Sequence, residues 1–128
     1  VEKLVLVVPA GIVNGSLWKG LARLALPMLR YRLFGGDHNL RRVLDPIMSN
    51  YDEDWYQYMG ATIHDMRIDP RIPPIAEDED LRRLTMPLLV VAAKDDISFP
   101  GERLIARVKS LVPHAQIELI EGKHSPPT

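Results

Sequence analysis

The sequence predicts an α/β fold in which a small, mostly parallel sheet is interrupted by a long helical insertion. Three apolar runs, at residues 4–8, 86–93 and 116–120, have the length and composition of strands. An amphipathic stretch separates the second run from the third, which is the strand–helix–strand order of a parallel crossover. Residues 12–84, between the first two runs, are instead rich in Leu, Met, Arg and aromatic residues with helical periodicity.

The three strands are expected to differ in burial. Residues 4–8 are continuously apolar, which is typical of a strand buried on both faces of a parallel sheet. Residues 86–93 repeat this pattern, with Pro87 near the start of the strand, where proline is tolerated. Residues 116–120 alternate between polar and apolar side chains, so this strand is expected to be partly exposed.

Helices are expected on both sides of the second strand. After it, Pro100 and Gly101 open a helix that Pro113 closes, and its apolar side chains form one stripe. In the insertion, a first helix over residues 17–33 should be kinked or split by Pro27, which cannot donate a backbone hydrogen bond.

The rest of the insertion predicts three more helices and one loop. A helix over residues 40–48 contains Pro46, and another starts at Asp52, a residue type that caps helix N-termini well. Residues 69–74 hold three prolines and are expected to form a loop. A short helix over residues 80–84 then leads into the second strand.

The composition excludes several classes of protein. The chain of 128 residues holds 16 basic and 17 acidic residues, and this balance forms no electrostatic surface for nucleic acid or an anionic membrane. It has no cysteine, which excludes disulfides, thiolate metal ligands and cysteine nucleophiles. No apolar run reaches the roughly 18 residues that a membrane helix needs. We therefore expect a cytoplasmic protein that binds neither nucleic acid nor membranes.

Ionisable side chains follow two of the predicted strands at the points where these strands end. Asp96 lies in the segment after the second strand, and His124 lies in the segment after the third. Ligands of open α/β sheets bind outside the carboxyl ends of the strands, where residues 9–15 also arrive. An acid and a histidine on adjacent strand ends can hydrogen-bond, and the acid then sets the tautomer of a general base.

The residues around this acid and this histidine resemble a known family. Residues 87–100, Pro-Leu-Leu-Val-Val-Ala-Ala-Lys-Asp-Asp-Ile-Ser-Phe-Pro, resemble the strand and acid turn of the α/β-hydrolase fold. Asp96 and Pro100 have the spacing that this family often shows. The helix and strand within residues 101–120 match the elements that follow, and Gly-Lys-His at 122–124 resembles the histidine loop. The acid precedes the histidine, as the family order of nucleophile, acid and histidine requires.

The start of the chain extends the resemblance to the whole sequence. Residues 1–11 resemble the strand that leads into the helical cap of this family. The resemblance implies the C-terminal part of an α/β-hydrolase sheet, with three mostly parallel strands and a helical cap insertion. The partial domain would have its core in residues 1–11 and 85–128 and its cap in about residues 12–84.

The nucleophile elbow of the family is absent from the sequence. The pattern Gly-x-Ser-x-Gly surrounds none of the five serines, Ser16, Ser49, Ser98, Ser110 and Ser125. The family's second oxyanion donor would also lie upstream, a further helix would follow His124, and Ala93 stands where glycine is frequent. We therefore expect a C-terminal fragment that lacks the nucleophile and does not turn over esters by itself.

The resemblance implies the function of a serine hydrolase that cleaves an ester or a similar acyl bond of a small molecule. Serine would attack, His124 would take its proton, and Asp96 would orient His124. Related members use other nucleophiles, including the aspartate of dehalogenases and epoxide hydrolases, and the missing elbow leaves this choice open. The resemblance implies no metal and no organic cofactor.

Other interpretations of the same residues stay open. A non-catalytic protein of this fold that binds a small molecule or a partner would also fit a chain without a nucleophile. Asp95 is the alternative acid, and Asp95 with Asp96 could form a Mg²⁺ pair of a phosphoryl-transfer receiver, although the further aspartate and lysine of such sites are not found. The remaining histidines, His38, His64 and His114, are expected to be surface or structural residues. Four aromatic residues either pack within the cap, which is favoured, or line an apolar pocket: Trp18, Trp55, Tyr56 and Tyr58.

The resemblance also predicts how the chain assembles. In the family, the strand at residues 4–8 has one neighbour in the second strand of this chain and another in the upstream half. Without that half it becomes an apolar edge, and such edges recruit other strands. We expect a homodimer through residues 4–8 and the cap helices, or pairing with the missing N-terminal half as a separate chain.

Overall fold

The computed structural model describes residues 1–50, 52–65 and 72–125 and contains a three-stranded sheet. The strands are β1 (Leu4–Val7), β2 (Leu88–Ala93) and β3 (Gln116–Ile120), in the order β1-β2-β3. Both pairs are parallel, with Leu4 opposite Leu88 and Ala93 opposite Ile120 at the two ends of the register. The predicted parallel arrangement is confirmed, and the C-terminal ends of all three strands meet at one edge of the sheet.

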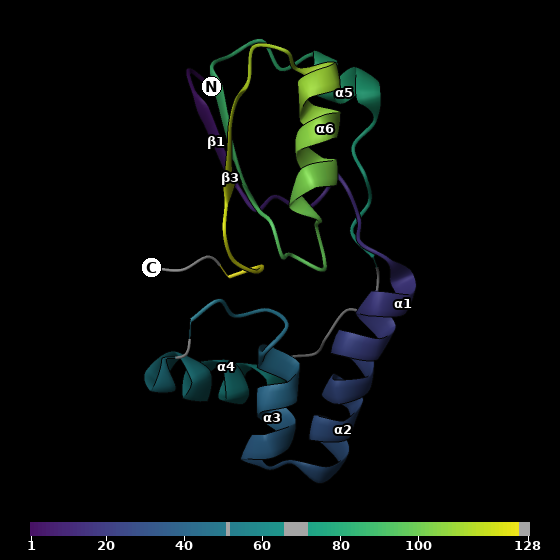
Figure 1. Cartoon of the computed structure of the whole chain (residues 1–128), viewed down its shortest axis with the longest axis vertical. Helices are drawn as coiled ribbons and strands as arrows, with labels where there is room; N and C mark the ends of the chain where they lie inside the picture. Colours follow the sequence, from purple (N-terminus) through teal and green to yellow (C-terminus); the bar gives the residue numbers. More distant parts are fainter. Residues whose placement is uncertain (51, 66–71, 126–128) are drawn as a thin grey trace.

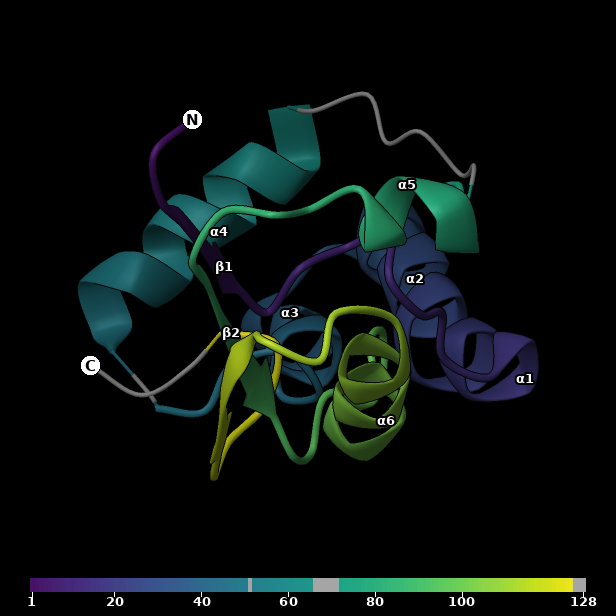
Figure 2. The same ribbon diagram turned by 90° about the horizontal axis from the view of Figure 1, so that it is seen from above.

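One face of the sheet carries the main hydrophobic core. Helices α5 (Asp78–Arg82) and α6 (Gly101–Leu111) lie on the same side of the strands (Figure 1, Figure 2). The side chains of Leu104 and Val108 in α6 are buried against the central strand, where Val90 is fully inaccessible to solvent. The predicted apolar stripe of α6 therefore holds the crossover in place.

A second group of helices lies beyond the ends of the strands (Figure 1). It consists of α1 (Leu17–Gly20), the π-helical segment η1 (Leu21–Ala25), α2 (Leu26–Phe34), α3 (Asp37–Leu44) and α4 (Glu53–Asp65). The group has a small core of its own, formed by Leu40, Val43, Leu44, Met48, Tyr56 and Ile63. Gly15, which precedes α1, donates its N–H to the carbonyl of Ser98, and a side chain at Gly15 would collide with the carbonyl of Ile97.

The helix around Pro27 is divided by a π-helical turn. The helical residues continue without a gap from Leu17 to Phe34, but the turn before Pro27 is the π-helical segment η1. The N–H of Leu26 donates to the carbonyl of Leu21, five residues earlier. A proline clashes with the carbonyl four residues before it, and the wider π turn is one way to accommodate it. The α-helix expected over residues 17–33 is therefore divided into α1 and α2 by a π turn.

The boundaries of the other inserted helices are shifted from the expected ones. Helix α3 starts at Asp37 rather than residue 40 and ends at Leu44, two residues before Pro46. Asp52 caps α4 as predicted, since its carboxylate accepts the N–H of Trp55 at 2.9 Å. Helix α5 starts at residue 78 rather than 80. Of the loop expected at 69–74, residues 69–71 lie outside the described residues, and 72–74 have no regular structure.

The expectation that the first strand is buried on both faces is wrong. Val5 and Val7 are 59% and 55% exposed, whereas Leu4 and Leu6 pack against the main core. Among the described residues, strand β1 lies at the edge of the sheet, as predicted, and only the face that carries Leu4 and Leu6 packs against the core. A continuous apolar run therefore does not distinguish a strand with one covered face from a strand with two.

The aromatic residues of the helical group differ in burial, which the sequence did not indicate. Tyr56 is buried in the core of the helical group and donates its hydroxyl proton to the carbonyl of Asp37, as expected for packing. Trp18 is 79% exposed, so the packing interpretation is wrong for this residue. Trp55 and Tyr58 stack on each other on the outside of α4, with ring centroids 5.2 Å apart. Among residues 1–50, 52–65 and 72–125, no helix is long and apolar enough to cross a membrane.

Candidate active site

Asp96 is a buried carboxylate held by the turn that follows β2. Asp96 is only 3% exposed. One carboxylate oxygen, Oδ1, accepts the backbone N–H groups of Ser98 at 2.7 Å and Phe99 at 3.1 Å. An aspartate at the start of such a turn bonds the backbone two and three residues later, which satisfies donors that the turn would leave unpaired. The other oxygen, Oδ2, is left to face the neighbouring strand end.

His124 meets that second oxygen from the loop after β3. Its Nδ1 lies 2.9 Å from Oδ2 of Asp96, so the contact predicted between these two residues is confirmed. The two loops are brought together by their backbones, because the N–H of Asp95 donates to the carbonyl of Gly122 at 2.9 Å. Gly122 has φ 128°, a conformation that glycine adopts far more readily than other residues, and it turns the chain from β3 toward the acid.

The electrostatics of the pair favour an ionised acid and an oriented ring. Burial is the largest single influence on Asp96 and raises its pKa, but it is outweighed by hydrogen bonds from His124, Phe99 and Ser98. The net effect holds the pKa of Asp96 below its usual value. An ionised Asp96 requires the hydrogen at Nδ1 of His124, which leaves Nε2 as the proton-accepting atom in the neutral ring.

The ring of His124 is supported on one side and open on the other. The ring of Phe99, which is buried, lies against it with centroids 5.4 Å apart and an angle of 58° between the planes. The side chain of His124 is 38% exposed, whereas that of Asp96 is completely covered. Within the described part of the chain, no group hydrogen-bonds Nε2. The histidine is thus fixed at one nitrogen and accessible at the other.

The neighbouring acid, Asp95, is exposed. The carboxylate that bonds His124 is that of Asp96. Within residues 1–50, 52–65 and 72–125 there is no group of three acidic or histidine side chains that could hold a metal ion. Away from the pair, a ring nitrogen of His114 lies 3.1 Å from the carbonyl of Met86. His64 pairs with its exposed neighbour Asp65.

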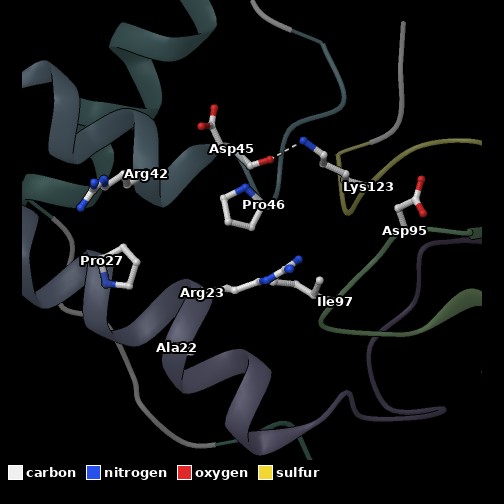
Figure 3. Close-up of a pocket in the computed structure, with 9 residues that line it drawn as sticks. All are labelled: Ala22, Arg23, Pro27, Arg42, Asp45, Pro46, Asp95, Ile97 and Lys123. Carbon is white, nitrogen blue, oxygen red and sulfur yellow. Dashed lines mark hydrogen bonds between the residues drawn. The ribbon is translucent and has the colours of Figure 1, made fainter.

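Two cavities flank the site and share Ile97 as a wall. One, of about 510 Å³, is largely apolar and lies between the turn at Ile97 to Phe99 and the helical segment, with Leu21, Leu24 and Met28 among its lining residues. The other, of about 520 Å³, is more polar (Figure 3). In it, the side chain of Arg23 reaches toward Ile97, and Lys123 and Asp95 form the opposite side. The π-helical segment η1 contributes side chains to both cavities.

The histidine loop has a support that sequence reasoning missed. Ser49, in the segment after α3, donates its hydroxyl proton to the carbonyl of Ser125 and accepts the N–H of Lys123. These are the two neighbours of His124 in the chain. A single sequence gives no sign of this contact, because no local pattern pairs Ser49 with Lys123, 74 positions away.

The lowered pKa of Asp96 predicts how stability responds to acid. A carboxylate whose pKa is lower in the folded state stabilises the fold fully above its unfolded value, here 3.8. That contribution is lost as the pH falls from there through the lower folded-state value. We expect the midpoint of urea unfolding to fall more steeply below pH 3.8 in the wild type than in Asp96→Asn. Parallel pH profiles for the two proteins would contradict the lowered pKa.

Comparisons with known proteins agree with the fold. No family model matches the sequence, and no curated protein matches it. A naproxen esterase from Bacillus subtilis has a similar structure with TM-score 0.73 and 16% identity, over 96% of this chain and 45% of its own. An esterase from Rhodococcus sp. ECU1013 has a TM-score of 0.68 and 18% identity, over 98% of this chain and 50% of its own. A meta-cleavage product hydrolase from Pseudomonas fluorescens IP01 has a TM-score of 0.61 and 19% identity, over 96% of this chain and 48% of its own.

These likenesses establish the architecture of the chain. It has the fold of the C-terminal part of an α/β-hydrolase domain, with three parallel strands and associated helices, and the predicted fold class is confirmed. The chain spans about half the length of the solved structures that it resembles. The solved structures named above are esterases and a hydrolase.

Proposed function

We propose that this chain supplies the acid and the base of a serine hydrolase that cleaves ester bonds of small molecules. The observation that carries the proposal is the pair at the strand ends, in which Asp96 holds Nδ1 of His124 at 2.9 Å and leaves Nε2 accessible. This is the orientation that a general base needs to take a proton from a hydroxyl nucleophile. Esterases among the similar structures support the choice of reaction.

The reaction would divide its groups between this chain and another segment of the complete protein. Because the 128 residues hold no Gly-x-Ser-x-Gly, we place the nucleophilic serine and the oxyanion donors on that other segment. Nε2 of His124 takes the serine proton as the oxygen attacks the ester carbonyl, and the ionised Asp96 stabilises the imidazolium that forms. His124 returns the proton to the departing alcohol, and a water molecule then releases the acid by the same steps.

The apolar cavity supports an ester with an apolar group as the substrate. Its lining combines Phe99, which touches the ring of His124, with Leu21 and Leu24 of the helical segment. An acyl or alcohol chain bound there would lie beside the base and lose its contact with water, which is the main source of affinity for such groups. We propose on the same grounds that residues 12–84 act as a cap over the site.

The exposed outer face and free edge of β1 support a partner strand. Val5 and Val7 are more than half exposed, and β1 has a paired neighbour on one side only within the described residues. We propose that this edge pairs with the sheet of the nucleophile-bearing segment. A homodimer through β1 is the competing assembly, and the mass in solution of the complete protein separates the two.

The proposed function is tested with the complete protein, an activated ester and a serine-reactive probe. We expect hydrolysis of p-nitrophenyl butyrate and covalent labelling by a fluorophosphonate on a serine outside these 128 residues. The isolated chain should show neither. Labelling of a serine within the chain would show that the nucleophile is misplaced, and absence of both activities in the complete protein would favour the non-catalytic binding protein.

A further inference from the structure

The histidine loop is attached to the segment that follows α3, and the hydroxyl of Ser49 makes two of the contacts. Both contacts of the Ser49 hydroxyl described above bracket His124, with Lys123 on one side and Ser125 on the other. The hydroxyl oxygen lies 2.7 Å from the N of Lys123 and 2.5 Å from the carbonyl oxygen of Ser125. One side chain therefore holds the backbone on both sides of the proposed base, from a segment more than 70 positions away.

The two sides of His124 depend on this hydroxyl to different degrees. Ser125 has further backbone contacts, because its N–H donates to Ile47 at 2.8 Å and its carbonyl also accepts the N–H of Ser49 at 3.2 Å. For the N–H of Lys123, the hydroxyl of Ser49 is the acceptor found in the described part of the chain. Loss of the hydroxyl would leave the Ser125 side held by its backbone contacts. The Lys123 side would lose its backbone contact and keep only the one from its side chain, whose Nζ donates to the carbonyl of Asp45 (Figure 3).

This asymmetry matters because the ring of His124 is anchored at two ends. Asp96 fixes Nδ1 at the far end of the side chain, and the backbone at Lys123 and Ser125 fixes the end where the side chain begins. Nε2 is aimed by both anchors together. A shift of about 1 Å in a catalytic group can cost about 100-fold in rate, so the second anchor affects catalysis without touching the substrate.

We propose that Ser49 is a positioning residue for His124 and couples the helical group to the base. The proposal rests on the proposed function for its kinetic effects, but its structural content does not. The hydroxyl of Ser49 bonds the backbone at Lys123 and Ser125 and so restricts the movement of the histidine loop. Its effect is therefore expected on the turnover rate rather than on substrate binding.

The kinetic test compares substitutions of Ser49 in the complete protein. We expect Ser49→Ala to lower kcat by about 10- to 100-fold and leave KM within about twofold, since an interaction needed only in the transition state is weakened. Ser49→Thr keeps the hydroxyl and should restore most of kcat. Ser49→Cys keeps the size but replaces the hydroxyl with a weak hydrogen-bonding thiol, so it should resemble Ala and serves if Ala does not fold.

The matched control and a spectroscopic measurement separate positioning from folding. Ser110→Ala removes a hydroxyl that bonds only within α6, to the carbonyl of Arg107, and should leave kcat unchanged. In proton NMR, we expect the Nδ1 hydrogen of His124 to give a sharp signal in the wild type and in Ser49→Thr, and a broadened or lost signal in Ser49→Ala and Ser49→Cys.

The outcomes distinguish this inference from the proposed function. If the complete protein hydrolyses esters but Ser49→Ala and Ser49→Cys keep wild-type kcat and a sharp signal, Ser49 is an ordinary loop residue and the inference is wrong. The inference is also wrong if KM of Ser49→Ala rises by as large a factor as kcat falls, or if kcat of Ser49→Thr is as low as that of Ser49→Ala. If no ester is hydrolysed, the proposed function fails, and the NMR comparison still decides whether Ser49 orders His124.

Discussion

We expect replacement of His124 with alanine to lower kcat of the proposed hydrolase by about 10⁶-fold, the order of magnitude seen when the base of a serine–histidine–acid unit is lost. The structure supplies the reason, since Nε2 is the accessible nitrogen of a ring whose other nitrogen is bound to Asp96. Without the ring, no group in the described part of this site can take a proton from a hydroxyl nucleophile at neutral pH. The measurement is the rate of p-nitrophenyl ester hydrolysis at saturating substrate, with circular dichroism as a check on folding.

His114 gives the matched control for this substitution. It is an exposed loop histidine whose ring contacts the carbonyl of Met86, and it lies at the opposite end of β3 from the site. His114→Ala should leave kcat within about twofold of the wild type, as most surface substitutions have small effects. Added imidazole should partly restore His124→Ala. An enzyme that keeps its activity without His124 would rule out this residue as the base.

We expect replacement of Asp96 with asparagine to lower kcat of the proposed hydrolase by about 10⁴-fold, because it changes the tautomer of His124. The backbone N–H groups of Ser98 and Phe99 already occupy Oδ1, so the amide of asparagine keeps its oxygen there and turns its NH₂ toward the ring. Nδ1 must then accept a hydrogen bond, which places the ring hydrogen on Nε2. A ring in that tautomer cannot take a proton from serine and no longer faces a negative charge when it becomes an imidazolium.

The adjacent carboxylate provides the comparison for Asp96. Asp95 is exposed and is the residue before Asp96 in the chain, whereas the hydrogen bond to His124 comes from Asp96. Asp95→Asn should keep kcat within about twofold, because the change removes a solvated charge. Nitrogen NMR of His124 should show the hydrogen on Nδ1 in the wild type and in Asp95→Asn, and on Nε2 in Asp96→Asn. A large loss of activity in the Asp95 variant instead would reassign the acid.

The elements predicted with success are those with a strong local pattern. Strand β2 is a run of apolar residues with turn residues on both sides, and α6 has an apolar stripe between two prolines. The order of strand, helix and strand leaves the parallel crossover as the favoured topology. Boundaries inside the helical group were less accurate, because Pro27 and Pro46 act on the turns around them in ways that depend on packing.

The same division holds for the candidate site. Asp96 and His124 could be placed together because each directly follows a strand, and parallel neighbours end at one edge of the sheet. Their roles as acid and base remain predictions. The bracket formed by Ser49 could not be predicted, since it joins a loop of the helical group to a loop of the sheet without a recurring sequence pattern.

The sequence by itself determined the class of the fold, the parallel crossover and the strand ends at which the acid and the histidine stand. It could do so because strand and helix periodicity is set by nearest neighbours in the chain and parallel strands share one direction. Only the tertiary structure decided that β1 leaves Val5 and Val7 exposed, that η1 lines two cavities, and that Ser49 holds the histidine loop. These features arise from contacts between distant segments, whose partners are chosen by packing of the whole chain and not by local pattern.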